Sequence, residues 1–354
     1  MKNRKVLIMN DFMKVTGYLI RNQDSESRAS CREMAYFPAL KVQPTMKKAI
    51  IDLGTNTFHL LLIEQTAINQ PVTVLFRDSR PAKIGKGGIN ESRITPEAIT
   101  RALTVLTYFR QVLDQQSIAP EIVQVIGTSA IRVAKNQAEF IERVRVETGL
   151  LVRVISGDEE AELIYRGVRA AGALDGKTSL IADIGGGSVE FIIGTDDRVF
   201  WKQSFEIGGQ RLLERFGQTD PISPSAVLRL TDFFREQLLD LANAVHQYAP
   251  TVLVGSSGTF DTLIDMAVMH ETGQWPDPDQ TTFTLPVAEF YQIFEQFLTR
   301  NRAERLALPG MIDLRVDMIV VACCLIDYLL KTFGLTQIRT STFSLKEGVL
   351  FSEE

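Results

Sequence analysis

The alternation of apolar and polar segments predicts strands and helices that follow one another along most of the chain. Short apolar runs bounded by glycine and polar residues are typical of buried strands. Between residues 95 and 116, apolar side chains recur at helical spacing at Leu103, Leu106, Phe109 and Leu113. A threonine followed by a proline begins this segment, as at many helix N-termini. Strands that alternate with helices indicate an α/β fold.

The predicted elements fall into two series, separated by the glycine-containing segment 172–176. The first series comprises a hairpin over 48–64, a strand near 71–78, a helix over 95–116, a strand over 122–127, a helix over 136–148, a strand over 151–155 and a helix over 157–171. The second comprises a hairpin over 178–194, a strand over 198–206, a helix over 224–246, a strand over 251–254, a helix over 258–268, helices near 286–299 and 315–333, a strand over 336–340 and a last helix over 345–353.

The two series also share two motifs in the same order. Residues 51–62 and 182–193 each consist of an apolar strand, an Asp-x-Gly turn and a second apolar strand, which predicts a β-hairpin. Residues 123–130 and 252–258 each consist of a short apolar strand and a loop of Gly, Ser and Thr. Because the spacing between the copies is nearly the same for both motifs, we predict a duplicated domain, with boundaries at 46–172 and 173–354.

Composition and charge narrow the class of protein. Hydrophobic residues make up 45% and charged residues 23% of the chain, which is typical of a globular protein. No apolar run approaches the roughly 20 residues of a membrane-spanning helix. Cys31, Cys323 and Cys324 have no metal-ligand spacing, and this favours a reducing cytoplasm. After residue 45, the chain contains 30 Lys or Arg and 39 Asp or Glu, and this net charge of −9 argues against a nucleic-acid-binding surface.

The first 45 residues differ in charge from the rest of the chain. They contain eight Lys or Arg and four Asp or Glu, whereas the whole chain is acidic. Met46 leads directly into the first predicted strand. We therefore expect Met46 to be the functional start and residues 1–45 to be a disordered leader or an artefact of the assigned start, with a structured arm as the alternative.

Four turns of small residues are candidates for phosphate binding: 52–57, 127–130, 183–188 and 255–259. Glycine lets a ligand approach the main chain, and successive backbone N–H groups in such turns form anion-binding nests. A helix follows two of the turns and adds its positive N-terminal end. A single turn of this kind is weak evidence, but two matched pairs predict two phosphate-binding sites that face each other across a cleft.

Two carboxylates beside one of these turns are candidate metal ligands. Asp183 ends one strand and Glu190 lies just after the turn, so the hairpin brings them together. Mg²⁺ binds a few carboxylates together with waters and phosphate oxygens. The alternative is that Asp183 caps the turn and Glu190 is solvated. Asp52 is expected to join the cluster, whereas His59 takes the place of Glu190 in the first copy.

Three further segments allow both a functional and a structural interpretation. The acidic residues of 156–161 are suited to a first helical turn, where they are common. Arg132 follows the 127–130 loop and is suited either to clamp a phosphate or to form a surface ion pair. The basic segment 77–88 is suited to meet a polyanion, although a solvated loop is the simpler interpretation.

Five motifs together resemble the exopolyphosphatase / guanosine pentaphosphate phosphohydrolase family. They are Asp-Leu-Gly-Thr-Asn-Thr-Phe-His at 52–59, Gly-Thr-Ser-Ala-Ile-Arg at 127–132, Ile-Ser-Gly-Asp-Glu-Glu-Ala at 155–161, Asp-Ile-Gly-Gly-Gly-Ser-Val-Glu at 183–190 and Gly-Ser-Ser-Gly-Thr at 255–259. The resemblance covers about residues 47–352. It implies two duplicated ribonuclease-H-like domains with mixed sheets flanked by helices, a cleft between them, and membership of the superfamily of actin, heat-shock chaperone ATPases and sugar kinases.

The resemblance also implies roles for particular residues. Glu160 matches the catalytic base, and Asp183 and Glu190 match the carboxylates that bind Mg²⁺ or Mn²⁺. The expected phosphate contacts are Asp52, Gly54, Asn56, Arg132, Gly185, Gly186, Gly187, Ser188 and Gly258. Asp158 stands where better-known members often have Asn, and we expect no functional consequence. Arg315 and Asp317 lie in a segment that matches less well and are left out of the site.

The expected function is Mg²⁺-dependent release of terminal phosphate from polyphosphate, with water as the nucleophile and Glu160 as a base of raised pKa. The alternatives are a guanosine pentaphosphate phosphohydrolase, which would use the same site, and a non-catalytic sensor of alarmones or polyphosphate. A sugar or acetate kinase is disfavoured by the Glu160 segment. The expected partners are polyphosphate or a guanosine polyphosphate, without nucleic acid or membrane. For the oligomeric state of the chain, we consider a homodimer.

Overall fold

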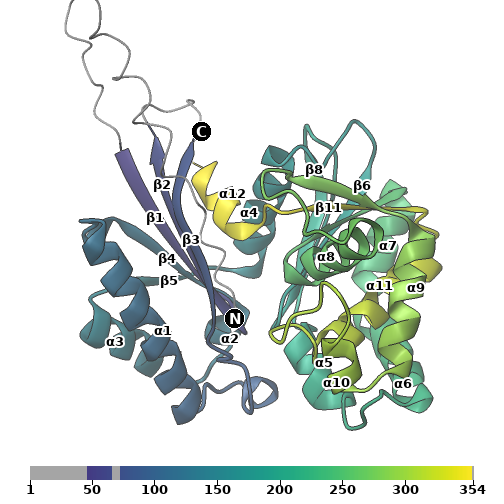
Figure 1. The fold of residues 1–354 in the computed structure, drawn as a ribbon, viewed down its shortest axis with the longest axis horizontal. Helices are drawn as coiled ribbons and strands as arrows, with labels where there is room; N and C mark the ends of the chain where they lie inside the picture. The colour runs from purple at the N-terminus through teal and green to yellow at the C-terminus, as the bar shows by residue number, and fades with distance from the viewer. Residues whose placement is uncertain (1–45, 66–71, 353–354) are drawn as a thin grey trace, which may run out of the picture. The chain divides into compact units, whose positions relative to one another are not determined.

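The computed structural model describes residues 46–65 and 72–352 (Figure 1). The expectation for residues 1–45 lies outside the described residues, as do the first residue of the strand predicted over 71–78 and the last residue of the helix predicted over 345–353. Within the described part, no helix is both long and apolar enough to span a membrane.

The first half of the described chain forms a five-stranded sheet with the strand order β3-β2-β1-β4-β5. Its strands are β1 (Met46–Leu53), β2 (Thr57–Gln65), β3 (Thr73–Pro81), β4 (Val123–Gly127) and β5 (Val152–Val154). Its helices are α1 (Pro96–Gln115), α2 (Ser129–Arg132), α3 (Gln137–Thr148) and α4 (Gly157–Ala170), with short 3-10 turns at Ile89–Glu91 and Pro120–Ile122.

The second half forms a six-stranded sheet with the order β10-β11-β9-β6-β7-β8 in the described residues. Its strands are β6 (Ser179–Ile184), β7 (Val189–Gly194), β8 (Val199–Phe205), β9 (Val252–Ser256), β10 (Thr282–Leu285) and β11 (Gln337–Ser341). Its helices are α5 (Gly209–Phe216), α6 (Pro224–Gln237), α7 (Leu239–Tyr248), α8 (Gly258–Thr272), α9 (Val287–Thr299), α10 (Arg302–Leu306), α11 (Ile319–Phe333) and α12 (Leu345–Leu350).

Both sheets have the same topology, apart from the added edge strand β10. In each, the first three strands form an antiparallel meander, and the fourth and fifth strands pair in parallel beyond the first. The motif repeat in the sequence therefore corresponds to a repeat of structure. The predicted fold class, two duplicated α/β domains with mixed sheets flanked by helices, is confirmed.

Along each strand, side chains alternate between the two faces of the sheet, so they pack in different hydrophobic cores. Helices α1 and α3 lie on one face of the first sheet (Figure 1). Ile51 and Val125 pack with these helices, whereas Ile50 and Ile126 belong to a different core. In the second sheet, residues such as Phe191 share a core with helices α5–α9 and α11. The remaining faces of both sheets contribute to one further core, which forms around α4 and α12.

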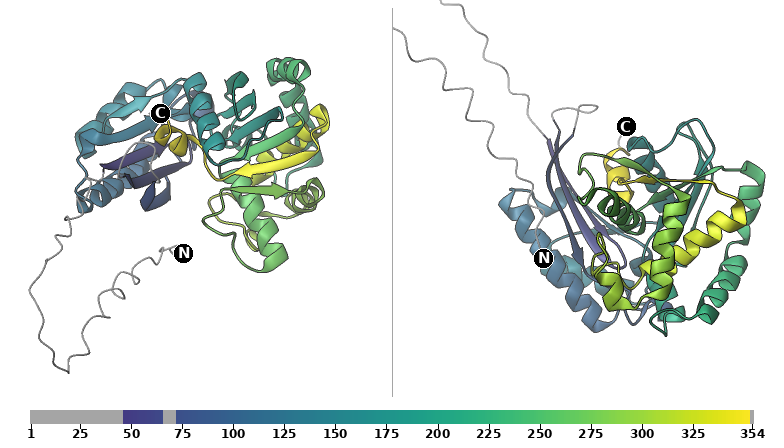
Figure 2. Two further views of the ribbon diagram at one scale, coloured as in Figure 1. Left: turned by 90° about the horizontal axis from the view of Figure 1, so that it is seen from above. Right: turned by 45° about the vertical axis from the view of Figure 1, so that its right-hand side comes forward.

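Helix α12 lies against α4 and β1, although it follows the last strand of the second sheet (Figures 1 and 2). Two glycines allow this close crossing. A Cβ atom on Gly348 would lie 1.7 Å from the Leu163 carbonyl oxygen, and one on Gly167 would lie 2.2 Å from the Ser344 carbonyl oxygen. The C-terminal segment thus joins the element that carries Glu160.

Several predicted boundaries are wrong. The helix predicted over 224–246 is two helices, because the backbone leaves the helical conformation at Leu238. Helix α11 begins at Ile319 rather than near 315, since residues 313–318 form turns. The short elements α5, β10 and α10 were not predicted, and the helix expected after the 127–130 loop begins within that loop, as α2. Each has only four to eight residues, and so its periodicity is too brief to detect.

Candidate active site

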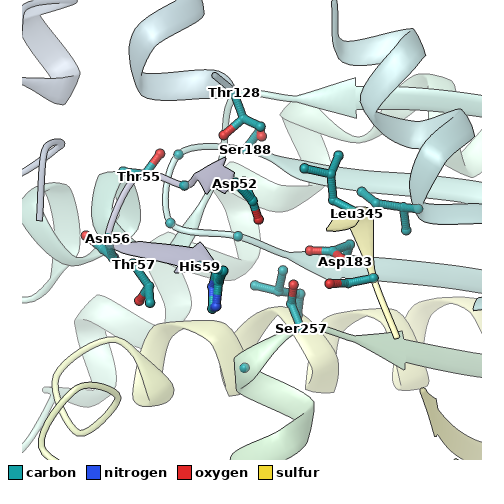
Figure 3. Close-up of a pocket in the computed structure, with 18 of the residues that line it drawn as sticks. Asp52, Thr55, Asn56, Thr57, His59, Thr128, Asp183, Ser188, Ser257 and Leu345 are labelled. Carbon is teal, nitrogen blue, oxygen red and sulfur yellow. The ribbon is translucent and has the colours of Figure 1, made fainter. Parts of the chain in front are cut away.

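The polar turns of both copies surround one pocket, as predicted for a cleft between them (Figure 3). The first copy supplies residues 54–57, Thr128 and Ser129, and the second supplies residues 185–188, Ser257 and Gly258. The pocket also contains five carboxylates, two basic side chains and one histidine. These are Asp52, Glu160, Asp183, Glu190, Asp261, Arg315, Lys346 and His59.

The two hairpins place equivalent residues in the pocket. Asp183 on β6 pairs directly with Glu190 on β7, and Asp52 on β1 pairs with His59 on β2. Cross-strand pairs of this kind have Cβ atoms about 4.5–5.5 Å apart. The structure therefore brings Asp183 and Glu190 together, as the sequence predicted. It also shows the asymmetry between the copies, because only the second hairpin places two carboxylates in the pocket.

The carboxylates are buried and repel one another. Burial raises the pKa of Glu190 well above its ordinary value, and the charges of Glu160 and Asp183 add to this. Burial likewise raises the pKa of Asp183, although hydrogen bonds from Ser257 and Ser256 oppose the shift. Burial raises the pKa of Asp52 to about 7. A proton or a cation therefore stabilises this cluster, because either removes part of the repulsion.

Glu160 lies in the first turn of α4 and faces the same pocket. Ser156 caps the helix by accepting a hydrogen bond from the Glu159 backbone N–H at 3.1 Å. Arg132 Nη1 donates to Glu160 Oε2 at 2.7 Å. Burial raises the pKa of Glu160 to about 7, and Arg132 opposes the shift. The raised pKa expected for the base is present in the protein itself, before any phosphate binds.

The glycine-rich turn after β6 lies in direct contact with the first copy. A Cβ atom on Gly187 would lie 2.4 Å from Thr55 Oγ1 and 2.5 Å from Ser129 Oγ. One on Gly186 would lie 2.7 Å from Asn56 Nδ2. These approaches are closer than real Cβ contacts, so an alanine at either position would have to displace the neighbouring side chains of the first copy.

Asn56 and Thr57 have unused hydrogen-bonding groups beside the pocket. The Asn56 side-chain amide donates to the sulfur of Met318. Asn56 Oδ1 and Thr57 Oγ1 are buried and have no hydrogen-bond partner among the described residues. Buried polar groups are nearly always paired in native proteins, so a ligand in the pocket is the natural partner for these two atoms.

Comparisons with known proteins now place this arrangement in a family. The model of the Ppx/GppA phosphatase family matches residues 62–354. The chain belongs to this family. It is 30% identical over 306 residues to a putative exopolyphosphatase from Haemophilus influenzae, and the match covers 86% of this chain and 91% of that protein. The resemblance inferred from the five motifs is therefore confirmed, as is the prediction of a hydrolase of the phosphatase class.

Solved structures of family members have the same fold. An exopolyphosphatase from Cytophaga hutchinsonii ATCC 33406 is 44% identical, with a TM-score of 0.83, and the match covers 87% of this chain and 97% of that one. A Ppx/GppA enzyme from Aquifex aeolicus is 27% identical, with a TM-score of 0.69, and the match covers 87% of this chain and 99% of that one.

In the present chain, most of the predicted site residues line one pocket. This holds for Asp52, Gly54, Asn56, Glu160, Asp183, Gly185, Gly186, Gly187, Ser188, Glu190 and Gly258. Arg132 is the exception, because its guanidinium group is directed to protein acceptors. It contacts Glu160, Glu206 at 3.1 Å and the Ile155 carbonyl at 3.4 Å.

Several residues of the site were missed. Arg315 was left out, yet its guanidinium group lies against Gly258, where a Cβ atom would be 1.8 Å from Nη2. Asp317 instead contacts Arg302 at 2.8 Å and does not line the pocket.

Lys346 enters the pocket from the segment after β11. That segment follows the carboxyl end of a parallel strand, where ligands of α/β sheets bind, and this topology could have indicated it.

His59 and the basic segment 77–88 complete the comparison with the sequence. The His59 ring nitrogen Nδ1 shares a hydrogen bond with Ser79 Oγ at 2.7 Å. Burial lowers the pKa of His59 well below its ordinary value, and Lys346 and Arg315 lower it further. The imidazole is therefore neutral at pH 7. None of the basic residues of the segment 77–88 lines the pocket.

Proposed function

We propose that the chain is a Mg²⁺-dependent exopolyphosphatase that releases the terminal phosphate of inorganic polyphosphate. The observation that carries the proposal is that Glu160, the Asp183–Glu190 pair and the glycine-rich turns share one pocket. Relatives named as exopolyphosphatases support the choice of substrate, most directly the Cytophaga hutchinsonii protein at 44% identity.

The substrate would be held by main-chain and basic groups from both copies. The turn at 185–188 offers backbone N–H groups, and the side chains of Arg315 and Lys346 supply positive charge at the pocket wall. The Thr57 hydroxyl has no hydrogen-bond partner in the described parts of the chain and is suited to donate to a phosphate oxygen. Such contacts would fix the terminal phosphoryl group in one orientation, which is the larger part of catalysis in phosphoryl transfer.

Glu160 is proposed to act as the general base. Its carboxylate would accept a proton from a water molecule while the water oxygen bonds to the terminal phosphorus. The bridging P–O bond then breaks, and the shortened chain leaves with the electron pair of that bond. With a pKa of about 7, Glu160 is partly ionised at neutral pH and basic enough to accept the proton.

The residues present fit a divalent cation. Asp183 and Glu190 offer adjacent oxygen ligands, and their raised pKa values mean that a positive charge nearby is favourable. Within the described residues, no group of three or more His, Cys, Asp or Glu side chains is placed to hold a metal. This suits Mg²⁺, which is often bound through one or two carboxylates, with waters and substrate phosphates as the other ligands. When bound, Mg²⁺ or Mn²⁺ supplies neutralisation of charge on the phosphoryl oxygens.

The proposal is tested by measuring phosphate release from long-chain polyphosphate and from guanosine pentaphosphate side by side. Each reaction is run with Mg²⁺, with Mn²⁺ and with a chelator. We expect release from polyphosphate that stops with the chelator and resumes when metal is restored. Release from guanosine pentaphosphate alone would replace the proposed substrate with the alternative one. Binding of either compound without release would indicate a sensor instead of an enzyme.

A further inference from the structure

A carboxylate that belongs to none of the sequence motifs lies beside the proposed base. Glu206 is in the connection between β8 and α5. Its Oε1 accepts a hydrogen bond from Arg132 Nη2 at 3.1 Å. Its Oε2 accepts from Ser129 Oγ at 2.6 Å and from Arg211 Nη2 at 2.8 Å. One side chain from the second copy thus gathers three donors, of which two belong to the first copy.

Glu206 and Glu160 share the guanidinium group of Arg132. Nη1 donates to Glu160 Oε2 at 2.7 Å, while Nη2 donates to Glu206 Oε1. An arginine that meets a single carboxylate usually binds both oxygens with two parallel hydrogen bonds. Here the two arms are divided between two carboxylates, so Arg132 contacts one oxygen of Glu160. The other oxygen, Oε1, lies outside this contact.

Glu206 is itself held in place by Arg211. The Arg211 side chain also donates to the Gly187 carbonyl from Nε and to the Ile89 carbonyl from Nη1, both at 2.8 Å. Arg211 therefore links the glycine-rich turn, the first copy and Glu206. Because Arg211 and Arg132 are mostly covered, with 12% and 18% of their side chains exposed, these contacts are partly shielded from water.

We propose that Glu206 is a positioning residue that keeps Arg132 from binding both oxygens of Glu160. The inference rests on the proposed role of Glu160 as the base. A base that deprotonates water needs one carboxylate oxygen free to accept the proton, with Arg132 fixing the orientation of the group through the other. Without the negative charge of Glu206, Nη2 keeps only neutral acceptors, among them Ser204 Oγ at 3.5 Å, and these attract it less than the ionised carboxylate of Glu160. Nη2 therefore turns to Glu160 Oε1.

The test is the Glu206→Gln variant, which keeps the shape of the side chain and removes its charge. We expect kcat for polyphosphate to fall about tenfold or more, as part of the roughly 10²–10⁴-fold that a general base contributes. KM should change little, because the pocket-lining groups remain. Glu142→Gln is the matched control. Glu142 receives two hydrogen bonds from Arg145, at 2.8 and 2.7 Å, on an exposed face of α3, so its loss should leave kcat unchanged.

Crystal structures of the wild-type protein and of Glu206→Gln give a readout that does not need activity. We expect both Nη atoms of Arg132 on Glu160 in the variant and one in the wild type. An unchanged Arg132, or an unchanged kcat, would overturn the inference. A rise in KM with a lower melting temperature and a normal kcat would also overturn it, because Glu206 would then only hold the two copies together. If the wild type hydrolyses neither substrate, the proposed function fails, whereas the Arg132 geometry still decides the structural part.

Discussion

Replacing Glu160 with Gln removes a proton acceptor from the pocket with almost no change in shape. Arg132 retains an acceptor in the Gln side-chain oxygen and keeps its bond to Glu206 at 3.1 Å. Exchanging a charged acceptor for a neutral one costs about 1–2 kcal/mol of hydrogen-bond energy. The variant also no longer buries a carboxylate whose ionisation is disfavoured, as its raised pKa shows. The two effects oppose each other, so we expect the melting temperature to shift by less than about 4 °C.

The effect on turnover should be far larger than the effect on stability. Loss of a general base typically lowers the rate by about 10²–10⁴-fold. The pH dependence adds a second signature. Glu160 must be ionised to accept a proton, and its pKa in the free protein is about 7, so the wild-type kcat/KM should rise as the pH rises through 7. At pH 6, about one-tenth of the wild-type molecules would hold an ionised Glu160. The Gln variant should lack this rise.

The assay is phosphate release at subsaturating and saturating polyphosphate over pH 5.5–9 for both proteins, which gives kcat/KM and kcat. Polyphosphate affinity and melting temperature are measured on the same preparations. Affinity should be unchanged or slightly higher in the variant, because one negative charge near the phosphates is gone. A folded variant with near-wild-type turnover and the same pH profile would refute the role of Glu160 as base. Lost affinity with normal turnover would make Glu160 a substrate-binding residue.

Three further predictions concern the metal site and the glycine-rich turn. Asp183→Asn and Glu190→Gln should each raise the Mg²⁺ concentration for half-maximal activity at least about tenfold. Neither change should lower the melting temperature of the metal-free protein. An unchanged Mg²⁺ titration in one variant would show that the replaced residue is not a metal ligand. Because the raised pKa values of both carboxylates let the folded state hold more protons than the unfolded chain, the stability of the metal-free protein should fall as the pH rises above about 4. Mg²⁺ should therefore raise the melting temperature more at pH 8 than at pH 5, and equal shifts would contradict this. Gly187→Ala would place a Cβ atom 2.4 Å from Thr55 Oγ1 and should cost about 1–3 kcal/mol and most of the activity, whereas Gly176→Ala, in open space, should cost neither.

The sequence predicted the parts of the site that depend on local structure. A strand, a turn of Asp and Gly, and a second strand specify a hairpin, and a tight turn fixes which residues pair. For this reason, the opposition of Asp183 and Glu190 follows from the sequence alone. The local evidence for a role of Glu160 was weaker, because acidic residues are common at helix starts. Only the resemblance of the five motifs to the family distinguished Glu160 from other acidic residues.

The residues that were missed depend on contacts between distant segments. Arg315 follows a series of turns and reaches Gly258 because α8 and α11 pack in one core. Lys346 lies beside β1 because two glycines let α12 cross α4. Glu206 acquires its partners from α2 and α5. None of these approaches is specified by the spacing of residues within one segment, so no periodicity or turn signal could have indicated them.

The two copies place different side chains in the pocket, which explains why the site needs residues from both copies. The first hairpin pairs Asp52 with His59, which burial keeps neutral, whereas the second pairs Asp183 with Glu190. Two carboxylates in both hairpins would add another negative charge to a cluster whose pKa values are already raised by burial and repulsion. Glu160, the proposed base, lies at the start of α4, the helix that packs against both sheets. The duplicated fold therefore provides two domains with similar backbones, and the proposed chemistry depends on the residues that differ between the two copies.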